Sequence, residues 1–175
     1  MSPELVLLGE PLCRQTEASS CSKASLAMIT ICPATEAHLD DLVPLVDGYR
    51  QFYRQPGDVD GARRFMNERF AKGDAHVLLA LDEDDHAVGF AQLFPVPSTT
   101  GLASRWILND LFVMPDARCR GAGSALLEAS RELARQHGVP QLMLRTQVEN
   151  ATAKARYHAL GWQRDEAFDT YLLAV

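Results

Sequence analysis

The sequence lacks the features that would direct it to a membrane or to a nucleic acid. No apolar run approaches the roughly 20 residues of a transmembrane helix, and Leu5-Val6-Leu7-Leu8 is too short for a signal peptide and has no basic residue before it. Positive charge is scarce, because 17 Lys and Arg face 23 Asp and Glu, giving a formal net charge of −6. Nucleic-acid binding requires a basic face. We therefore expect no membrane and no nucleic-acid partner, whereas the negative charge is compatible with cationic substrates such as amines.

Cysteine is also sparse. The four cysteines, Cys13, Cys21, Cys32 and Cys119, form no CxxC pair and no Cys/His cluster with the spacing of a zinc site. We therefore expect no metal centre. An even number of cysteines leaves disulfides open as an alternative, but the favoured interpretation is a set of reduced thiols in a cytoplasmic protein.

The length of 175 residues, with 47% apolar and 23% charged residues, is typical of one soluble globular domain. Residues 1–27 differ from the rest, because they are rich in serine and show no clear hydrophobic period. We interpret them as a mobile N-terminal extension. The alternative is a short helix that packs on the domain or on a neighbouring subunit. Residues 28–175 form the predicted domain.

Hydrophobic periodicity and turn residues predict strands and helices in alternation. The strands are expected at about 28–32, 76–81, 87–94, 106–114, 142–146 and 170–174, and the helices after Thr35 and at about 59–71, 121–137 and 150–160. Pro44 predicts a kink or break in the first helix, and residues 95–104, rich in Pro, Ser, Thr and Gly, are expected to form a loop. This order indicates an α/β or α+β sandwich.

The run Arg118-Cys119-Arg120-Gly121-Ala122-Gly123 joins a predicted strand to a predicted helix. A helix N-terminus presents free N–H groups and the positive end of a dipole, which together bind phosphate. Gly121 and Gly123 let the backbone approach an anion, Arg118 and Arg120 add positive charge, and Ser124 offers a hydroxyl. The run predicts an anion site. The alternative is a helix start whose glycines only allow tight packing.

Two other phosphate loops are excluded by the residues after the glycines. A P-loop requires GxxxxGK[ST], but no Lys follows Gly123. A Rossmann fingerprint requires GxGxxG, but Gly121-Ala122-Gly123 is followed by Ser124-Ala125-Leu126, so the third small position is missing.

Motifs on both sides of the loop make the pattern specific. The triplet Leu111-Phe112-Val113 precedes it, and Asn150, Ala153, Tyr157, Gly161 and Trp162 follow a strand at fixed spacing. Over roughly residues 104–164 this constellation resembles the GNAT superfamily of N-acetyltransferases, and residues 28–95 match in element order. The resemblance implies an α/β (α+β) GNAT fold, with a mixed sheet of about six to seven strands, about four helices, and a splay between the strands 106–114 and 142–146.

The resemblance also implies acetyl-CoA as the co-substrate. Backbone groups of Leu111, Phe112 and Val113 would pair with the pantetheine arm and polarise the thioester carbonyl. Asn150 and Ala153 would lie against the same cofactor. The pyrophosphate would be held beside Arg118 by the loop amides, those of Cys119, Arg120, Gly121, Ala122, Gly123 and Ser124.

Two residues are expected to move protons. By resemblance, Tyr157 would protonate the departing thiolate, and a thiol pKa of about 8.5 makes that proton useful. The acceptor amine must lose a proton, and polyamine acetyltransferases of the superfamily carry an acid two positions before the triplet. Asn109 stands there in this chain, followed by Asp110. We expect Asp110 to act, directly or through a water. The alternatives are a turn-stabilising role at a bulge, and Glu149 as a weaker base.

Further stretches, including Tyr49–Tyr53 and Gly161–Asp165, resemble the bacterial and fungal branch of histone and D-amino-acid acetyltransferases.

We expect direct transfer of acetyl, in a ternary complex, to the primary amine of a small molecule or an amino acid. The alternatives are protein lysine acetylation and a catalytically silent acetyl-CoA-binding module. The aromatic residues Tyr49, Phe52 and Tyr53 would line the acceptor pocket or close the first helix on the core. A homodimer is expected by resemblance and by general prevalence.

Overall fold

A computed structural model of the chain describes residues 28–175. The predicted N-terminal extension, residues 1–27, and with it Cys13 and Cys21, lies outside the described residues.

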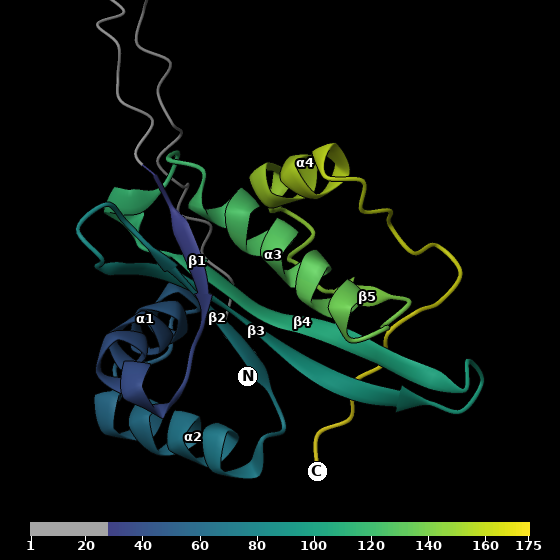
Figure 1. Ribbon diagram of the computed structural model, residues 1–175. Helices are drawn as coiled ribbons and strands as arrows, with labels where there is room; N and C mark the ends of the chain where they lie inside the picture. Colours follow the sequence, from purple (N-terminus) through teal and green to yellow (C-terminus); the bar gives the residue numbers. More distant parts are fainter. Residues whose placement is uncertain (1–27) are drawn as a thin grey trace, which may run out of the picture.

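A mixed five-stranded sheet forms the centre of the described domain, in the order β1-β2-β3-β4-β5 (Figure 1). Neighbouring strands are antiparallel from β1 to β4, and β5 runs parallel to β4. The strands are β1 Thr30–Pro33, β2 His76–Leu81, β3 Ala87–Ser98, β4 Ala103–Val113 and β5 Leu142–Leu144. The α+β class and the mixed sheet are confirmed.

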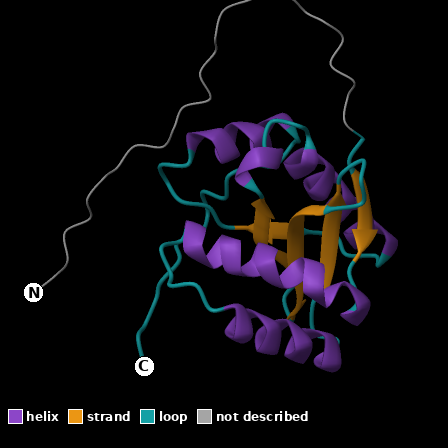
Figure 2. Ribbon diagram, turned by 90° about the vertical axis from the view of Figure 1, so that its left-hand side faces the viewer, coloured by secondary structure: helices purple, strands orange, loops and turns teal. Residues whose placement is uncertain are grey.

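Helices cover both faces of this sheet. Figure 2 shows the sheet lying between helices on either side. A short 3-10 turn, Glu36–His38, leads into α1, Leu39–Phe52, which lies with α2, Val59–Lys72, on one face. On the other face lies α3, Ala122–Gln136, with α4, Ala151–Ala159, beside it (Figure 1).

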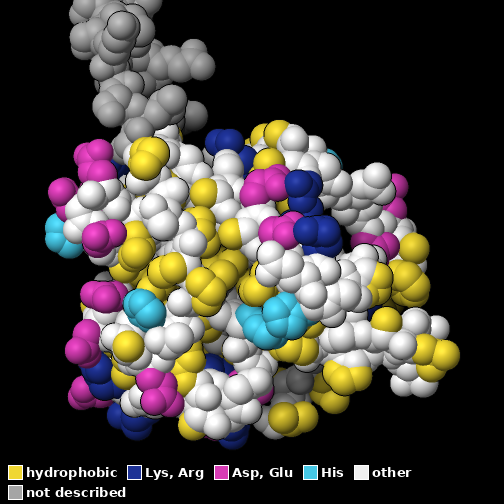
Figure 3. All heavy atoms as spheres, viewed as in Figure 1, with side chains coloured by type: hydrophobic (Ala, Val, Ile, Leu, Met, Phe, Trp, Pro, Cys, Tyr) yellow, Lys and Arg dark blue, Asp and Glu magenta, His cyan; other side chains and the backbone are white. Residues whose placement is uncertain are grey.

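The alternation of side chains along β3 and β4 builds two cores, one on each face. Phe90 and Phe112 pack with Leu42 and Met66 of the helices α1 and α2. Leu93, Trp106 and Leu108 pack instead with Leu126 and Leu127 of α3, among other buried residues. On the surface viewed in Figure 3, acidic and basic side chains are interspersed, in keeping with the composition.

The predicted helix ends agree with local capping chemistry. The Asp58 carboxylate accepts a hydrogen bond of 2.8 Å from the Gly61 amide and begins α2, and Gly73 ends that helix at φ +60°. Asn150 begins α4 by accepting a 3.0 Å bond from the Ala153 amide. The predicted ranges 59–71 and 150–160 come close to these helices because caps involve only neighbouring residues.

Three expectations were wrong. Residues 170–174 form no strand, since this segment packs on no neighbour and Tyr171 and Leu172 are 89% and 88% exposed, so five strands are described rather than six to seven. The expected loop at 95–104 is mostly a hairpin arm, because β3 pairs with β4 out to Ser98. Pro95 and Pro97 are tolerated there because β2 pairs with β3 only as far as Leu93, which leaves that edge open. Finally, Pro44 does not break α1, which continues through it as one helix whose neighbouring residues are buried in the core.

Candidate functional site

The strands β4 and β5 separate after a short stretch of pairing. Trp106, Ile107 and Leu108 pair with Leu142, Met143 and Leu144, and the ladder is confined to these residues. Residues 109–113 of β4 therefore run on beside an opening between the two strands. This opening is the predicted splay.

A β-bulge at Asn109 sets which side chains of β4 face α1. The register against β3 shifts there, because Asp110 is opposite Gln92 whereas Leu108 is opposite Leu93. Asn109 is the extra residue and is exposed. Beyond it, Asp110 shares the α1 face of the sheet with Phe112, which is 7% exposed in the core under that helix.

Two of the three triplet residues direct their backbone groups into the splay. The Met114 amide donates to the Val88 carbonyl at 2.9 Å, which fixes the phase of the antiparallel ladder. The amide and carbonyl of Phe112 consequently pair with β3, whereas those of Leu111 and Val113 point toward the opening. The Val113 carbonyl accepts a hydrogen bond from Arg118, and the other three groups are suited to pair with an extended ligand arm.

The loop after β4 forms a concave turn of backbone at the N-terminus of α3. Cys119 and Gly121 have φ values of +62° and +92°, and Gly121 is the N-cap. The first backbone bond of the helix runs from the Ala125 amide to the Gly121 carbonyl at 3.0 Å. The amides of Ala122, Gly123 and Ser124 therefore begin the helix without carbonyl partners within it.

This turn has room for an anion. A Cβ built on Gly121 would meet nothing within 4 Å, and one on Gly123 would meet only a Val113 methyl at 3.9 Å. A pyrophosphate requires hydrogen-bond donors, positive charge and space, and this turn offers free amides, the positive end of a helix dipole and an open approach. The residues present thus fit the pyrophosphate of acetyl-CoA, and all six predicted loop residues, 119–124, lie in this turn.

Arg118 connects the loop to a cavity beneath α1. Its Nε donates to the Val113 carbonyl at 3.2 Å, and its guanidinium carbon lies 5.7 Å from the centre of the Phe52 ring. The cavity has a volume of about 520 Å³ and is lined by Pro44, Gly48, Gln51, Phe52, Phe112, Met114, Pro115 and Arg118. It therefore lies on the same face of β4 as Asp110.

The Asp110 carboxylate is held by two neighbours. The Asn109 side-chain amide donates to both of its oxygens at 3.1 Å, and the Tyr49 hydroxyl of α1 donates a further hydrogen bond. Burial raises the pKa of Asp110, and these two hydrogen bonds oppose the rise. A carboxyl with a raised pKa is a better proton acceptor than an ordinary aspartate.

Tyr157 lies on α4, half-buried against the α3 core. Burial, and then the nearby Tyr53, raises the pKa of Tyr157, while a hydrogen bond with the Thr146 side chain lowers it. The net rise keeps the phenol protonated at neutral pH. Its ring centre lies 6.1 Å from that of Trp162, the aromatic residue of the Gly161-Trp162 pair.

A pair of tyrosines on α1 lies between these two residues. Tyr49 and Tyr53 are hydrogen-bonded to each other, with ring centres 5.1 Å apart and nearly perpendicular. Tyr49 reaches Asp110, and Tyr53 interacts electrostatically with Tyr157. The fold therefore brings the sequence-predicted acid and base to opposite ends of one aromatic cluster.

Asn150, Ala153 and Glu149 lie at the start of α4. The Asn150 side-chain oxygen accepts a hydrogen bond from the Ala153 amide as the helix cap, and the contact of both residues with acetyl-CoA stays a prediction. Glu149 is exposed in the preceding turn, and the described hydrogen bonds and electrostatic partners link it to neither Asp110 nor Tyr157.

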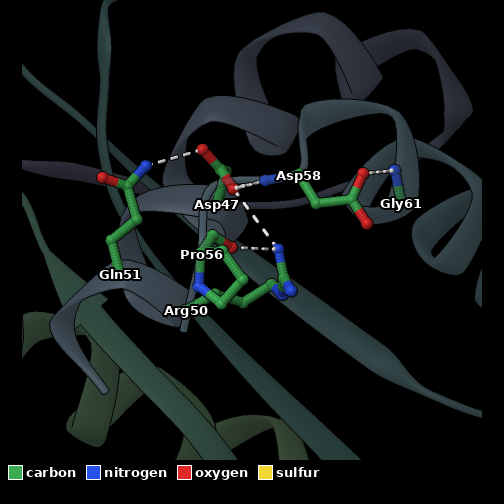
Figure 4. Close-up of polar contacts among 6 residues, drawn as sticks. All are labelled: Asp47, Arg50, Gln51, Pro56, Asp58 and Gly61. Atoms are coloured by element: carbon green, nitrogen blue, oxygen red, sulfur yellow. Dashed lines mark hydrogen bonds and ion pairs between the residues drawn. The ribbon is translucent and has the colours of Figure 1, made fainter. Parts of the chain in front are cut away.

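Sequence reasoning missed the part that Asp47 plays in the site (Figure 4). Its buried carboxylate accepts 2.7 Å hydrogen bonds from the Asp58 amide and the Gln51 side chain, and Arg50 bridges it to the Pro56 carbonyl. This network ties the α1–α2 connection to the helix end that carries Tyr53. An acid on an otherwise apolar helix face is the only signal that the sequence offers for it.

The comparisons with known proteins agree with this geometry. Residues 42–162 match the family described as Acetyltransferase (GNAT) family. An uncharacterized N-acetyltransferase, YhfO of Bacillus subtilis (strain 168), is 40% identical over 77% of this chain and 89% of its own length. An aminoglycoside N(6')-acetyltransferase type 1 of Klebsiella aerogenes is 32% identical over 56% of this chain and 65% of its own.

A solved structure of a probable acetyltransferase superposes with a TM-score of 0.79 at 35% identity, covering 83% of this chain and 97% of that one. In residues 28–175, no helix is both long and apolar enough to cross a membrane.

Proposed function

We propose, since the chain belongs to the GNAT family of acetyltransferases, that it acetylates the primary amine of a small molecule in a ternary complex. As a member of this family it is an acyltransferase, and its co-substrate is acetyl-CoA. One observation carries the proposal: Asp110 and Tyr157 flank a single tyrosine pair beside the splayed edge of β4. An acid and a base at one opening are what direct transfer from a thioester to an amine requires.

The donor is held by backbone groups. The amides of residues 119–124 take the pyrophosphate, and the Leu111 amide and carbonyl, with the Val113 amide, take the pantetheine arm along the splay. Acetyl-CoA supplies the thioester. A backbone amide in the splay then polarises its carbonyl as an oxyanion donor, which stabilises the negative charge that develops during attack.

The two side chains move the protons. An alkylamine with a pKa of about 10.4 is almost fully protonated at neutral pH, so Asp110 removes one proton before the nitrogen attacks the carbonyl carbon. Tyr157 donates its phenol proton to the sulfur as the carbon–sulfur bond breaks. The raised pKa of Asp110 makes its carboxylate a stronger base, and the raised pKa of Tyr157 keeps its phenol protonated until the sulfur leaves.

The acceptor is a small amine or an amino acid. The cavity of about 520 Å³ under α1 lies within the size range of small-molecule sites, roughly 300 to 1,000 Å³. Phe52 and Phe112 supply apolar wall, and Arg118 and Gln51 supply polar groups. The similarity to an enzyme named for aminoglycoside acetylation supports a small-molecule acceptor over a protein.

The test is release of CoA thiol from acetyl-CoA against a panel of acceptors: polyamines, amino acids, an aminoglycoside and a lysine peptide. We expect turnover with a small amine, and we expect Tyr157→Phe to reduce kcat about 100-fold or more while acetyl-CoA binding is retained. Preference for the lysine peptide would favour a protein acetyltransferase. Tight acetyl-CoA binding without any acceptor, and without an effect of Tyr157→Phe, would show a silent binding module.

A further inference from the structure

Tyr49 of α1 is hydrogen-bonded to the proposed base, Asp110. Its ring is held by edge contacts with Phe90 and Phe112, whose ring centres lie 5.9 and 6.1 Å away, and with Tyr53. Two of these three contacts are core residues, so the ring has little freedom. The hydroxyl at its end is therefore placed by packing.

The hydroxyl of Tyr49 has one proton to give. It donates that proton to the Asp110 carboxylate, and it is also hydrogen-bonded to the Tyr53 hydroxyl. Burial, then the charge of Asp110, raises the pKa of Tyr49, so the phenol stays neutral and remains a donor. Tyr49 therefore lies between Tyr53 and Asp110 in one hydrogen-bonded group of three side chains.

The other groups that face Asp110 carry no charge. On β4 its neighbour is the Asn109 amide. On β3 the opposite residue is Gln92, which is 2% exposed and whose Nε2 has no hydrogen-bond partner in the described domain. The group that α1 places against Asp110 is the Tyr49 hydroxyl. Among the described groups packed around Asp110, Tyr49 is therefore the one that can ionise.

We propose that Tyr49 is the positioning residue of the base: its hydroxyl fixes the Asp110 carboxylate on the α1 face and favours the ionised form that accepts the amine proton. Tyr53 orients that hydroxyl from the next turn of the helix. The inference rests on the proposed function, because it assigns a role to Tyr49 in the reaction assigned to Asp110.

The pH profile separates this role from simple packing. A hydrogen bond donated to a carboxylate lowers its pKa. Removing the Tyr49 hydroxyl therefore raises the pKa of Asp110 and moves the acidic limb of kcat/KM toward higher pH, by about one pH unit for a bond to a charged group. Loss of packing alone would lower activity at every pH without moving the limb.

The experiment measures kcat/KM against pH for the full chain and for Tyr49→Phe, with acetyl-CoA affinity as a second readout. We expect the limb to move up, kcat/KM at pH values below the limb to fall about tenfold, and acetyl-CoA affinity to stay the same. Tyr53→Phe is expected to give a smaller shift in the same direction. Tyr171→Phe, at a tyrosine that is 89% exposed, is the matched control and should change nothing. An unmoved limb in Tyr49→Phe would overturn the inference.

Asp110→Asn distinguishes failure of the inference from failure of the proposed function. If Asp110→Asn keeps both its activity and the acidic limb, Asp110 is not the base and the proposed function fails at that residue. If it abolishes the limb while Tyr49→Phe leaves the limb in place, only the role of Tyr49 fails. Should Tyr49→Phe not fold, Tyr53→Phe carries the test, because it removes only the hydroxyl that orients Tyr49.

Discussion

The Asp47 carboxylate accepts a hydrogen bond of 2.7 Å from the backbone amide of Asp58, eleven residues later in the chain. Because Asp47 is 6% exposed, its removal empties a buried position and takes the hydrogen-bond acceptor from that amide, from the Gln51 side chain and from Arg50. We expect Asp47→Ala to lower the free energy of unfolding by about 2 to 3 kcal/mol. Urea denaturation followed by circular dichroism measures it.

Asp40 provides the control for this prediction. It also lies on α1 and pairs with Arg63 at 2.8 Å, but its side chain is 87% exposed. Exposed ion pairs contribute roughly 0 to 1 kcal/mol, so Asp40→Ala should be nearly neutral. Equal losses in both variants would show that the Asp47 network does not anchor the α1–α2 connection.

The anion site at the start of α3 is best tested at Gly123. A carboxylate there would meet the position proposed for the pyrophosphate, whereas Gly123→Ala adds one methyl group in open space. We expect Gly123→Glu to weaken acetyl-CoA binding at least 100-fold in isothermal titration calorimetry, and Gly123→Ala to weaken it little. Gly121 is a less clean target, because at φ +92° any side chain strains the backbone. Undiminished affinity in Gly123→Glu would refute the site.

The raised pKa of Tyr157 makes a prediction about alkaline pH. A phenol with a pKa above its usual value of about 10 stays protonated through the working range. We therefore expect kcat to show no decline that belongs to Tyr157 below pH 10. The ultraviolet pH titration of the unchanged protein, minus that of Tyr157→Phe, gives the ionisation of Tyr157 alone. Formation of its phenolate near pH 8 would contradict the environment described for this side chain.

The histidines beside Trp106 predict how stability depends on pH. The His76 ring stacks on Trp106 with centres 4.2 Å apart, and burial, then the nearby His137, lowers the pKa of His76. Below about pH 6.5 the unfolded chain binds a proton that folded His76 refuses, so stability falls as the pH falls through that window. Unfolding at pH 7.5 and pH 5.5 should show the loss, and His76→Phe, which keeps a ring in the stack, should reduce it.

Close approach of β3 to β4 depends on Gly89. A Cβ at this position would lie 2.7 Å from the Phe112 carbonyl oxygen, which is backbone and cannot move aside. Gly89→Ala should therefore cost about 1 to 3 kcal/mol of stability and weaken acetyl-CoA binding by displacing the triplet. Gly101→Ala, whose nearest contact is a Ser98 side chain at 3.4 Å, is the matched control. An unchanged free energy of unfolding in Gly89→Ala would mean that β3 and β4 can move apart without a loss of stability.

Local signals made much of the fold legible in the sequence. The helices predicted at about 59–71 and 150–160 agree closely with α2 and α4, because helix ends depend on residues a few positions apart. The loop at 118–123 was found for the same reason. Pro95 misled because a strand tolerates proline where one neighbour is missing, and only the pairing of β2 shows where that is.

The contact between Tyr49 and Asp110 could not be predicted from the sequence. The two residues are far apart in the chain, and their contact depends on the register between β3 and β4. A shift of one residue turns every side chain of a strand to the other face. The periodicity of residues 106–114 predicted the strand but not the bulge, so it could not say whether Asn109 or Asp110 faces α1.

The bulge at Asn109 also changes how this strand should be compared with its relatives. Since one unpaired residue shifts the phase, an acidic side chain can serve the α1 face from a neighbouring position while the triplet after it stays in place. A comparison that examines residue 109 alone would conclude that the chain has lost its acid. Aligning such strands by the face that each side chain occupies, rather than by position along the chain, would take account of the carboxylate of Asp110 on the α1 face, where the proposed reaction needs a base.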